Sequence, residues 1–408
     1  MLELPFIEKK TLSARVNLPA SKSISHRYLI IQALAFHNAI TLHNISDSND
    51  TRLLQKALMC LGGEVNFEDA GTPMRFFLAY AAMKDLRVVI NGNESLKVRP
   101  IAPLVEALRQ LGCRINYLEK EGCLPLFIEK GIDLNCESVT IESEMSSQFL
   151  SALLLIGPCF QNGLTIVSNG ALNSQPYIDL TLDAMFKCGV AVKVEANQYN
   201  VPNAFYKASS SLIIEADWSA AAFVLAWAIA RRSEIEIPDL STDSKQGDKV
   251  SKLFYESLGV KIYANKNTNS VRVLSGELHL PKHLQFDFTQ TPDMFPVIAA
   301  TCAYLNISAN FYGVKNLVLK ESNRIEAMRE NLAQVGATLH AINDNELLLN
   351  FVVPSIHSYA FKSYNDHRIA MACSIFAFDK NSTIDDALVV QKSFPNYWNL
   401  FFKMAYES

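Results

Sequence analysis

The sequence predicts a mixed α/β (α+β) protein of two or more domains, and two observations support this prediction. The chain has 408 residues, which is more than one hydrophobic core usually accommodates. One pattern also recurs along the chain: an amphipathic helix followed by glycine and a β-prone strand. This recurrence indicates an architecture of repeated α/β units. The glycines that end the helices are Gly62, Gly112, Gly189, Gly259 and Gly336.

Each of these glycines is expected in the left-handed conformation that turns a helix into the next strand. Their spacing is uneven, because successive glycines lie 50, 77, 70 and 77 residues apart. The short interval lacks roughly one strand–strand or strand–helix segment, at the point where residues 64–67 run almost directly into residues 68–72. We expect a domain boundary in the Ser-rich stretch 209–215, before a long apolar helix that Asp217 begins.

The composition argues against several classes of protein. Hydrophobic residues make up 49% and charged residues 19% of the chain, and the net charge of −4 argues against nucleic-acid binding. We see no signal peptide, and the apolar segments are too short to span a bilayer. The eight cysteines form no C-x-x-C pair, and Pro281 separates the closest histidine pair, His279 and His283. We therefore expect a cytoplasmic protein with reduced thiols, no metal and no membrane association.

Residues 18–35, LPASKSISHRYLIIQALA, form the most informative stretch. The pattern predicts a helix with Ile24, Tyr28, Ile31 and Ala35 on its buried side. Its first turn carries Lys22, Ser23 and Arg27, where free backbone N–H groups already favour an anion. A phosphate or carboxylate site is one interpretation, and a serine-capped surface helix with solvated basic residues is the other.

Further helix starts share this pattern of polar side chains placed just before an apolar helix. They lie at residues 146–148, 174–177, 293, 316–324, 365–368 and 391–395. Singly, each has an ordinary explanation, such as a helix cap or a surface ion pair worth about 0–1 kcal/mol. Together they favour a shared cleft for an anionic small molecule over independent caps.

The chain resembles the enolpyruvyl transferase family, and within it the branch that acts on shikimate 3-phosphate. The resemblance runs from Leu18 to about Trp398 and rests on nine motifs in family order. These are SKSISHR, AGTPMR, RPIAPLVEALRQLG, SSQFLSALL, SQPYID, TPDMFP, KESNRIEAM, NDHRIAMA and KSFP.

The resemblance implies a two-domain inside-out α/β barrel with three repeated α/β units in each domain. Domain I would comprise residues 1–20 and 215–408, domain II residues 21–214, and the active site would lie in the cleft between them. Relatives carry additional residues between Gly62 and Gly71, so the first unit of domain II is expected to be trimmed.

The implied reaction transfers the enolpyruvyl group of phosphoenolpyruvate to the 5-hydroxyl of shikimate 3-phosphate and releases phosphate. It belongs to the shikimate pathway, which leads to chorismate and the aromatic amino acids. The partners would be these two small anions, with no cofactor and no nucleic acid, and we expect a monomer.

The resemblance also implies the site residues, carried over motif by motif. Those for shikimate 3-phosphate are Lys22, Ser23, Arg27, Ser146, Ser147, Gln148, Ser174, Tyr177, Asp293, Asn316 and Lys320. Those for phosphoenolpyruvate are Lys22, Gly71, Arg99, Gln148, Arg324, Arg368 and Lys392. Asp293 is the candidate acceptor of the hydroxyl proton, and Glu321 is the candidate partner in proton transfer at the methylene carbon. Lys22 competes for either step.

Two rival interpretations stay open on the sequence alone. The sibling enzyme that uses UDP-N-acetylglucosamine carries a reactive cysteine where this chain has Glu94, which argues against that substrate. A non-catalytic ligand-binding relative is suggested by the trimmed unit and by Asp69, which stands where the family usually has asparagine. A carboxylate there would repel an incoming phosphate unless a cation pairs it. The retained Asp293 and Glu321 argue for an active enzyme.

Overall fold

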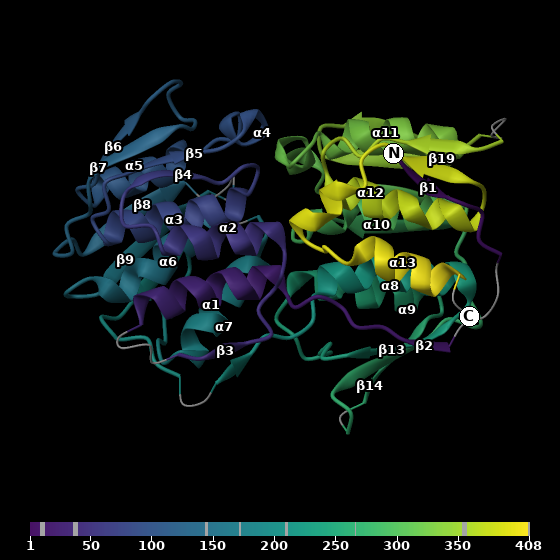
Figure 1. Ribbon diagram of the computed structural model, residues 1–408, viewed down its shortest axis with the longest axis horizontal. Helices are drawn as coiled ribbons and strands as arrows, with labels where there is room; N and C mark the ends of the chain where they lie inside the picture. The colour runs from purple at the N-terminus through teal and green to yellow at the C-terminus, as the bar shows by residue number, and fades with distance from the viewer. Residues whose placement is uncertain are drawn as a thin grey trace. The chain divides into compact units, whose positions relative to one another are not determined.

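The computed structural model describes residues 1–8, 13–35, 40–142, 146–170, 173–208, 211–265, 267–352 and 357–406. Residues 209 and 210 of the predicted boundary stretch lie outside this range. The chain divides into two compact units, each with its own sheets and helices (Figure 1). Unit 1 comprises Met1–Ala20 and Glu215–Ser408, and unit 2 comprises Ser21–Ile214.

Unit 2 contains two four-stranded sheets that share one βαβαββ topology. In each, two parallel strands are joined through a helix, and a second helix leads into an antiparallel hairpin. The first consists of β4 (Gly63–Asn66), α3 (Gly71–Met83), β5 (Val88–Asn91), α5 (Ala102–Gln110), β6 (Arg114–Tyr117) and β7 (Leu126–Lys130), with the short α4 (Glu94–Lys97) after β5. The second consists of β8 (Ser138–Glu142), α6 (Ser147–Ile156), β9 (Leu164–Asn169), α7 (Gln175–Lys187), β10 (Lys193–Glu195) and β11 (Gln198–Val201).

Unit 1 repeats this topology twice and adds a three-stranded sheet. One repeat consists of β2 (Ser13–Arg15), α8 (Trp218–Arg231), β13 (Glu234–Pro238), α9 (Val250–Ser257), β14 (Lys261–Asn265) and β15 (Ser270–Leu274). The other consists of β16 (His283–Asp287), α10 (Phe295–Tyr304), β17 (Ser308–Tyr312), α11 (Arg324–Gln334), β18 (Ala337–Asn343) and β19 (Glu346–Phe351). The third sheet pairs β21 (Ser382–Ile384) with β20 (Tyr359–Phe361) and with β1 (Leu2–Leu4), accompanied by α12 (His367–Cys373) and α13 (Tyr397–Tyr406).

The predicted glycine turns are present at four of the five repeats. Gly112, Gly189, Gly259 and Gly336 have φ angles between 80° and 93°, in the left-handed region. At the first repeat the prediction is wrong by one residue, because Gly63 takes the left-handed conformation with φ 88°. Gly62 has φ 156°, which is close to extended backbone.

The predicted trimming is visible in unit 2. Strand β3 (Leu42–His43) lies in the chain between α1 (Lys22–Leu34) and α2 (Asn49–Leu58), and it pairs in parallel with β12 (Leu212–Ile213). After α2 the chain enters β4 at once, and β4 pairs with β5 in the neighbouring sheet. Among the described residues, therefore, the β3–β12 pair lacks the closing hairpin that the four complete repeats possess.

The core of unit 1 is built around helices that are apolar on nearly every side, which is the pattern of a buried helix. Ser219 is the only residue of α8 that is not buried. Helix α10 packs against α8, α11 and α12, and α11 also packs against α12 (Figure 1). These contacts bring the N-terminal ends of α10, α11 and α12 within reach of one another.

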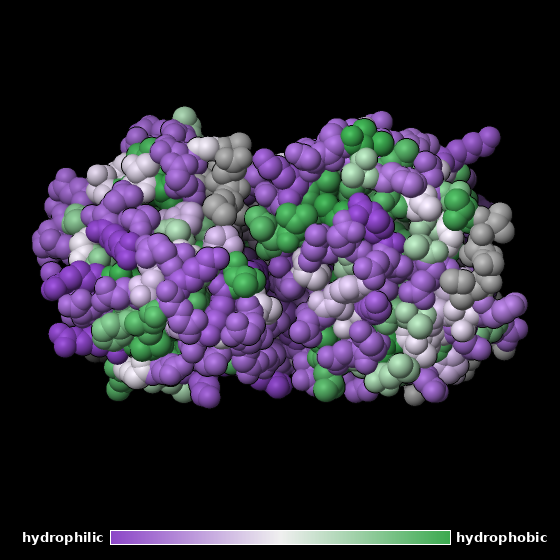
Figure 2. All heavy atoms as spheres, turned by 90° about the horizontal axis from the view of Figure 1, so that it is seen from above, coloured by the Kyte–Doolittle hydropathy of each residue, from purple (hydrophilic) through white to green (hydrophobic). Residues whose placement is uncertain are grey.

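On the face seen in Figure 2, hydrophobic residues form separate groups among mainly hydrophilic ones, which is ordinary for a protein surface. None of the described helices combines the length and the apolar character needed to cross a lipid bilayer.

Candidate functional site

Three helix starts in unit 1 place charged side chains together. Asp293 lies in the single 3₁₀ turn η4 (Pro292–Met294) that leads into α10, and Arg324 is the first residue of α11. Arg368 is the second residue of α12, whose N-cap is Asp366. Because α10, α11 and α12 pack against one another, residues separated by 31 to 75 positions in the chain are in contact.

Arg324 is at the centre of this cluster, and its side chain has no exposed surface. Its guanidinium donates to Asp293 Oδ1 at 2.7 Å, to Glu321 Oε2 at 2.8 Å and to Asp366 Oδ2 at 2.8 Å. Burial alone would lower the pKa of Arg324, but the three carboxylates outweigh it and hold that pKa well above its usual value. The arginine therefore stays charged and donates to three carboxylates in this structure.

Asp293 connects the cations of the cluster. Arg368 Nη2 donates to its Oδ2 at 2.9 Å, and Lys320 Nζ lies 3.9 Å from its Oδ1. Burial raises the pKa of the Asp293 carboxyl, but the positive charges around it outweigh this and hold the pKa well below its usual range. These charges belong to Arg368, Arg324 and Lys320, in order of decreasing effect. Asp293 is thus ionised at neutral pH.

A second buried carboxyl lies behind Arg368. The Ser219 hydroxyl donates to Asp248 Oδ2, and Arg368 Nη2 lies 3.5 Å from the Ser219 hydroxyl oxygen. Burial raises the pKa of Asp248 to about 6, although the positive charge of Arg368 opposes the shift. This chain of contacts runs from Asp248 through Ser219 and Arg368 to Asp293. The motifs of the sequence did not predict its first two members.

The two other predicted residues of unit 1 lie beside the same helices. Asn316 is half-buried in the 3₁₀ helix η5 (Lys315–Leu319), which packs against α11. Lys392 is buried at the end of η7 (Leu388–Lys392), which packs against α12.

In unit 2, Lys22 and Ser23 begin α1, as the sequence predicts. Lys22 Nζ donates to Asp50 Oδ2 at 2.8 Å, and Asp50 is buried in the first turn of α2. Ser21 holds the N-cap position of α1, but its hydroxyl makes no capping hydrogen bond. The interpretation of the stretch as a serine-capped surface helix is therefore wrong, since eight consecutive residues from Ile24 to Ile31 are buried.

Arg27 holds α1 and α7 together. Its Nε donates to Thr181 Oγ1 at 2.8 Å, its Nη1 to the Ser23 carbonyl at 2.7 Å and its Nη2 to the Tyr177 carbonyl at 2.8 Å. Burial lowers the pKa of Arg27 to about 10, so it stays charged at neutral pH. A guanidinium has five N–H donors, and these three contacts leave two of them for another ligand.

The hydroxyl residues predicted at the other helix starts of unit 2 have distinct roles. Ser146 is the N-cap of α6 and accepts from the Gln148 backbone N–H at 3.3 Å, whereas Ser147 is buried in the first turn. Ser174 precedes α7 in a left-handed conformation with φ 63° and forms no side-chain cap, and Tyr177 is half-buried. Capping therefore accounts for Ser146 and leaves the hydroxyls of Ser147 and Ser174 for other contacts.

Gly71 begins α3 and lies against two arginines. A Cβ atom there would approach Arg75 Nη1 to 2.8 Å and Arg99 Cζ to 3.0 Å. Arg75 Nη1 also donates to Gln148 Oε1 at 2.7 Å, and Arg99 Nη1 lies 3.5 Å from the Asp69 carbonyl. The structure thus brings Gly71, Arg99 and Gln148 together, as the motifs predict. It adds Arg75 to this group. The position of Arg75 one helical turn after Gly71 is the sequence feature that could have identified it.

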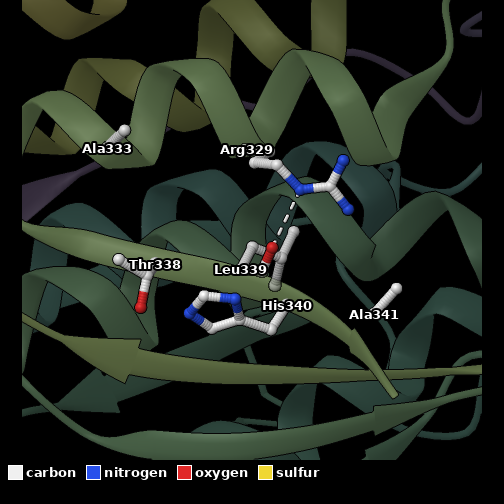
Figure 3. Close-up of a pocket in the computed structure, with 6 residues that line it drawn as sticks. All are labelled: Arg329, Ala333, Thr338, Leu339, His340 and Ala341. Atoms are coloured by element: carbon white, nitrogen blue, oxygen red, sulfur yellow. Dashed lines mark hydrogen bonds between the residues drawn. The ribbon is translucent and has the colours of Figure 1, made fainter. Parts of the chain in front are cut away.

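A surface pocket elsewhere in unit 1 is separate from these residues. It lies between α11 and β18 and is lined by Arg329, Ala333, Thr338, Leu339, His340 and Ala341 (Figure 3). Arg329 Nε donates to the Leu339 carbonyl at 2.8 Å across it. No predicted site residue lines this pocket.

Comparison with known proteins identifies the family. The family model for EPSP synthase (3-phosphoshikimate 1-carboxyvinyltransferase) matches residues 7–70 and 64–401. The chain belongs to the EPSP synthase family. The two matched stretches overlap at residues 64–70, where the β3–β12 unit lacks its hairpin.

Curated relatives and solved structures agree with this membership. The 3-phosphoshikimate 1-carboxyvinyltransferase of Bacteroides fragilis (strain YCH46) is 37% identical over 396 residues, with 95% of this chain and 94% of the relative covered. That of Vibrio cholerae serotype O1 (strain M66-2) is 34% identical over 427 residues, with 97% of each covered.

The structural likenesses concern the fold. The structure of EPSP synthase from Acinetobacter baumannii has a TM-score of 0.77 at 18% identity, with 98% of each chain covered. The enolpyruvyl transferase NikO from Streptomyces tendae has a TM-score of 0.71 at 12% identity, with 98% of this chain and 96% of that chain covered. The predicted family, enzyme class and mixed α/β fold class are confirmed.

Proposed function

We propose that this member of the EPSP synthase family transfers the enolpyruvyl group of phosphoenolpyruvate to the 5-hydroxyl of shikimate 3-phosphate and releases phosphate. The observation that carries the proposal is the arrangement around Arg324. Two carboxylates on different segments, Asp293 and Glu321, are held by one buried guanidinium. A protein that only bound anions would gain nothing from placing two negative charges there.

We assign the substrates to the residue sets of the two units. Lys22, Ser23, Arg27, Ser146, Ser147, Gln148, Ser174 and Tyr177 of unit 2, with Asp293, Asn316 and Lys320 of unit 1, would hold shikimate 3-phosphate. Gly71, Arg99 and Gln148 of unit 2, with Lys22 and with Arg324, Arg368 and Lys392 of unit 1, would hold phosphoenolpyruvate. The proposal thus assigns residues of both units to the same pair of substrates.

The reaction needs a group that accepts the hydroxyl proton and a group that exchanges a proton with the methylene carbon. Asp293 suits the first task because it is ionised, and Glu321 would serve the second. When the hydroxyl oxygen bonds to the substituted vinyl carbon, the methylene carbon gains a proton. Phosphate then leaves as the bond between its bridging oxygen and the substituted carbon breaks. The former methylene carbon, now a methyl group, gives back a proton.

The contacts of Asp293 have a consequence for binding. Arg324 and Arg368 both donate to its carboxylate. The phosphate and carboxylate of phosphoenolpyruvate would compete with Asp293 for these guanidinium groups. Loss of those contacts would raise the basicity of Asp293 at the moment when it must accept a proton.

The first experiment measures phosphate release from purified protein supplied with shikimate 3-phosphate and phosphoenolpyruvate, with UDP-N-acetylglucosamine as the control acceptor. We expect release only with shikimate 3-phosphate. Absence of release with either acceptor, from protein that is folded and binds shikimate 3-phosphate, would overturn the proposed reaction and favour a non-catalytic binding relative.

A further inference from the structure

The starts of α1 and α2 meet through a buried polar interface in unit 2. Lys22 in α1 and Asp50 in α2 are 28 positions apart in the chain, yet Lys22 Nζ and Asp50 Oδ2 lie 2.8 Å apart. The Lys22 side chain is 16% exposed and that of Asp50 only 3%. This ion pair is thus much less accessible to water than an ordinary surface pair, and solvent screens it correspondingly less.

Neighbouring hydrogen bonds fix the helix start that carries Asp50. Ser48 is the N-cap of α2 and accepts from the Thr51 backbone N–H at 3.3 Å. The hydroxyls of Ser48 and Thr51 lie 2.8 Å apart, and Thr51 Oγ1 lies 3.1 Å from His26 Nε2 of α1. The neighbours of Asp50 in the chain, Ser48 and Thr51, are therefore fixed by hydrogen bonds, and Thr51 also contacts α1.

A second link joins the same two segments. The Ser25 hydroxyl donates to the Ser21 carbonyl at 2.8 Å and accepts from the Ser46 backbone N–H at 3.0 Å. All three serines are buried. The backbone at the start of α1 is thus fixed on the chain segment that leads to Asp50, and the lysine ammonium has a defined partner at a defined place.

We infer that Asp50 positions the Lys22 ammonium for the transfer reaction, an inference that rests on the role proposed above for Lys22. A lysine side chain has four rotatable bonds, and a carboxylate 2.8 Å from Nζ restricts them. A carboxylate beside an anion-binding cation also weakens anion binding, so its presence is explained by orientation and not by affinity. Asp50 is accordingly a positioning residue that acts through Lys22.

The test is a double-mutant cycle with Asp50→Asn, Lys22→Ala and the double variant, scored by kcat and by the Kd for shikimate 3-phosphate. Asp50→Asn is expected to lower kcat about tenfold. Its Kd should rise less than about twofold, because loss of a negative charge offsets loss of orientation. In the Lys22→Ala background the same substitution should change neither quantity by more than about twofold.

Asp47→Asn is the matched control, since it removes the same charge from an exposed position three residues earlier. An equal fall in kcat in both backgrounds, or a Kd that rises as much as kcat falls, would overturn the inference. If Lys22→Ala leaves kcat and Kd unchanged, the proposed role of Lys22 fails, which is a separate outcome.

A second measurement tests whether Asp50 holds the Lys22 ammonium, even if Lys22→Ala has no measurable turnover. The rate at which acetic anhydride acylates Lys22 is followed by mass spectrometry in the unliganded protein. Loss of the ion pair in Asp50→Asn should raise this rate about fivefold, and Asp47→Asn should leave it unchanged. An unchanged rate in Asp50→Asn would show that Asp50 does not hold the ammonium.

Discussion

Arg324 and Asp366 form an ion pair from which solvent is fully excluded. Arg324 Nε donates to Asp366 Oδ2 at 2.8 Å, and neither side chain has any exposed surface. The same aspartate caps α12 by accepting from the Arg368 backbone N–H at 2.9 Å. One carboxylate thus fixes the guanidinium at the start of α11 and the helix that carries the second arginine of the cluster.

Removal of this carboxylate should destabilise the protein. Asp366→Ala leaves a buried guanidinium with one counter-charge fewer, and loss of one partner of a buried pair costs about 3–5 kcal/mol. Asp366→Asn should cost less, because asparagine still caps the helix. Denaturant unfolding of the two variants checks this order. Equal stability of Asp366→Ala and the parent would contradict it.

Loss of either candidate proton-transfer group should affect turnover more than binding. Asp293→Asn and Glu321→Gln are each expected to lower kcat by about 10²-fold or more, with the Kd for shikimate 3-phosphate largely kept. Steady-state kinetics and titration calorimetry provide the two numbers. Glu326→Gln, which removes an exposed carboxylate from α11, is the control. Near-normal turnover in both variants would remove the assigned roles.

The raised pKa of Asp248 predicts a pH dependence of stability. A carboxyl with pKa about 6 in the folded protein, against about 3.8 when unfolded, binds protons in the folded state between these values. Its contribution to stability is therefore greatest below pH 4 and is lost as pH rises through 6. Asp248→Asn should lose this dependence and gain stability relative to the parent, by up to about 3 kcal/mol above pH 7.

Unfolding free energies of the parent and the variant at pH 4.5 and pH 8 test this prediction. The exposed Asp243→Asn serves as control. If the unfolding free energies of Asp248→Asn and the parent differ by the same amount at both pH values, the buried carboxyl is not the source of the pH dependence.

A methyl group at Gly71 should disturb the two arginines beside it. Its Cβ would lie 2.8 Å from Arg75 Nη1 and 3.0 Å from Arg99 Cζ, so both guanidinium groups must shift. Gly71→Ala is expected to raise the KM for phosphoenolpyruvate about tenfold with little change in the Kd for shikimate 3-phosphate. Gly276→Ala is the matched control, because a Cβ there meets nothing within 4 Å. An unchanged KM would contradict the proposed position of phosphoenolpyruvate.

The carboxylate of Asp69 should weaken phosphoenolpyruvate binding. This half-buried residue lies two positions before Gly71, and its carbonyl is 3.5 Å from Arg99 Nη1. Asp69→Asn removes a negative charge next to the predicted anion site and should tighten binding of phosphoenolpyruvate. Titration of the variant measures this effect, with Glu68→Gln as the exposed neighbouring control. Equal or weaker binding would refute the prediction.

Local patterns predicted much of the fold. Helix periodicity and the glycine after each helix are set within about ten residues, so the repeats and the left-handed turns could be recognised. The choice of Gly63 over Gly62 could not, because two adjacent glycines are equally able to adopt φ 88°. The trimmed unit was detectable as a short interval, but its form, a two-stranded pair without a hairpin, depends on contacts between residues 42 and 212.

The site was predicted unevenly for a related reason. Motifs placed Arg324 and Arg368 at separate helix starts. Their contacts with Asp293 come from the packing of three helices and have no local signal. Asp50 and Asp248 were missed because an aspartate near a helix start most often caps or faces solvent. Only their burial beside a cation distinguishes them.

The pairing of β1 with β21 delays the completion of their sheet during synthesis, because the two strands lie far apart in the chain. Leu2 pairs with Ile384, so β1 finds its partner only after about 380 further residues have been made. At a synthesis rate of about 5–20 residues per second, β1 stays without that partner for roughly 20–80 seconds. During this interval its edge is open to other strands, and the sheet of β20, β21 and β1 is completed only after residue 384 has been made.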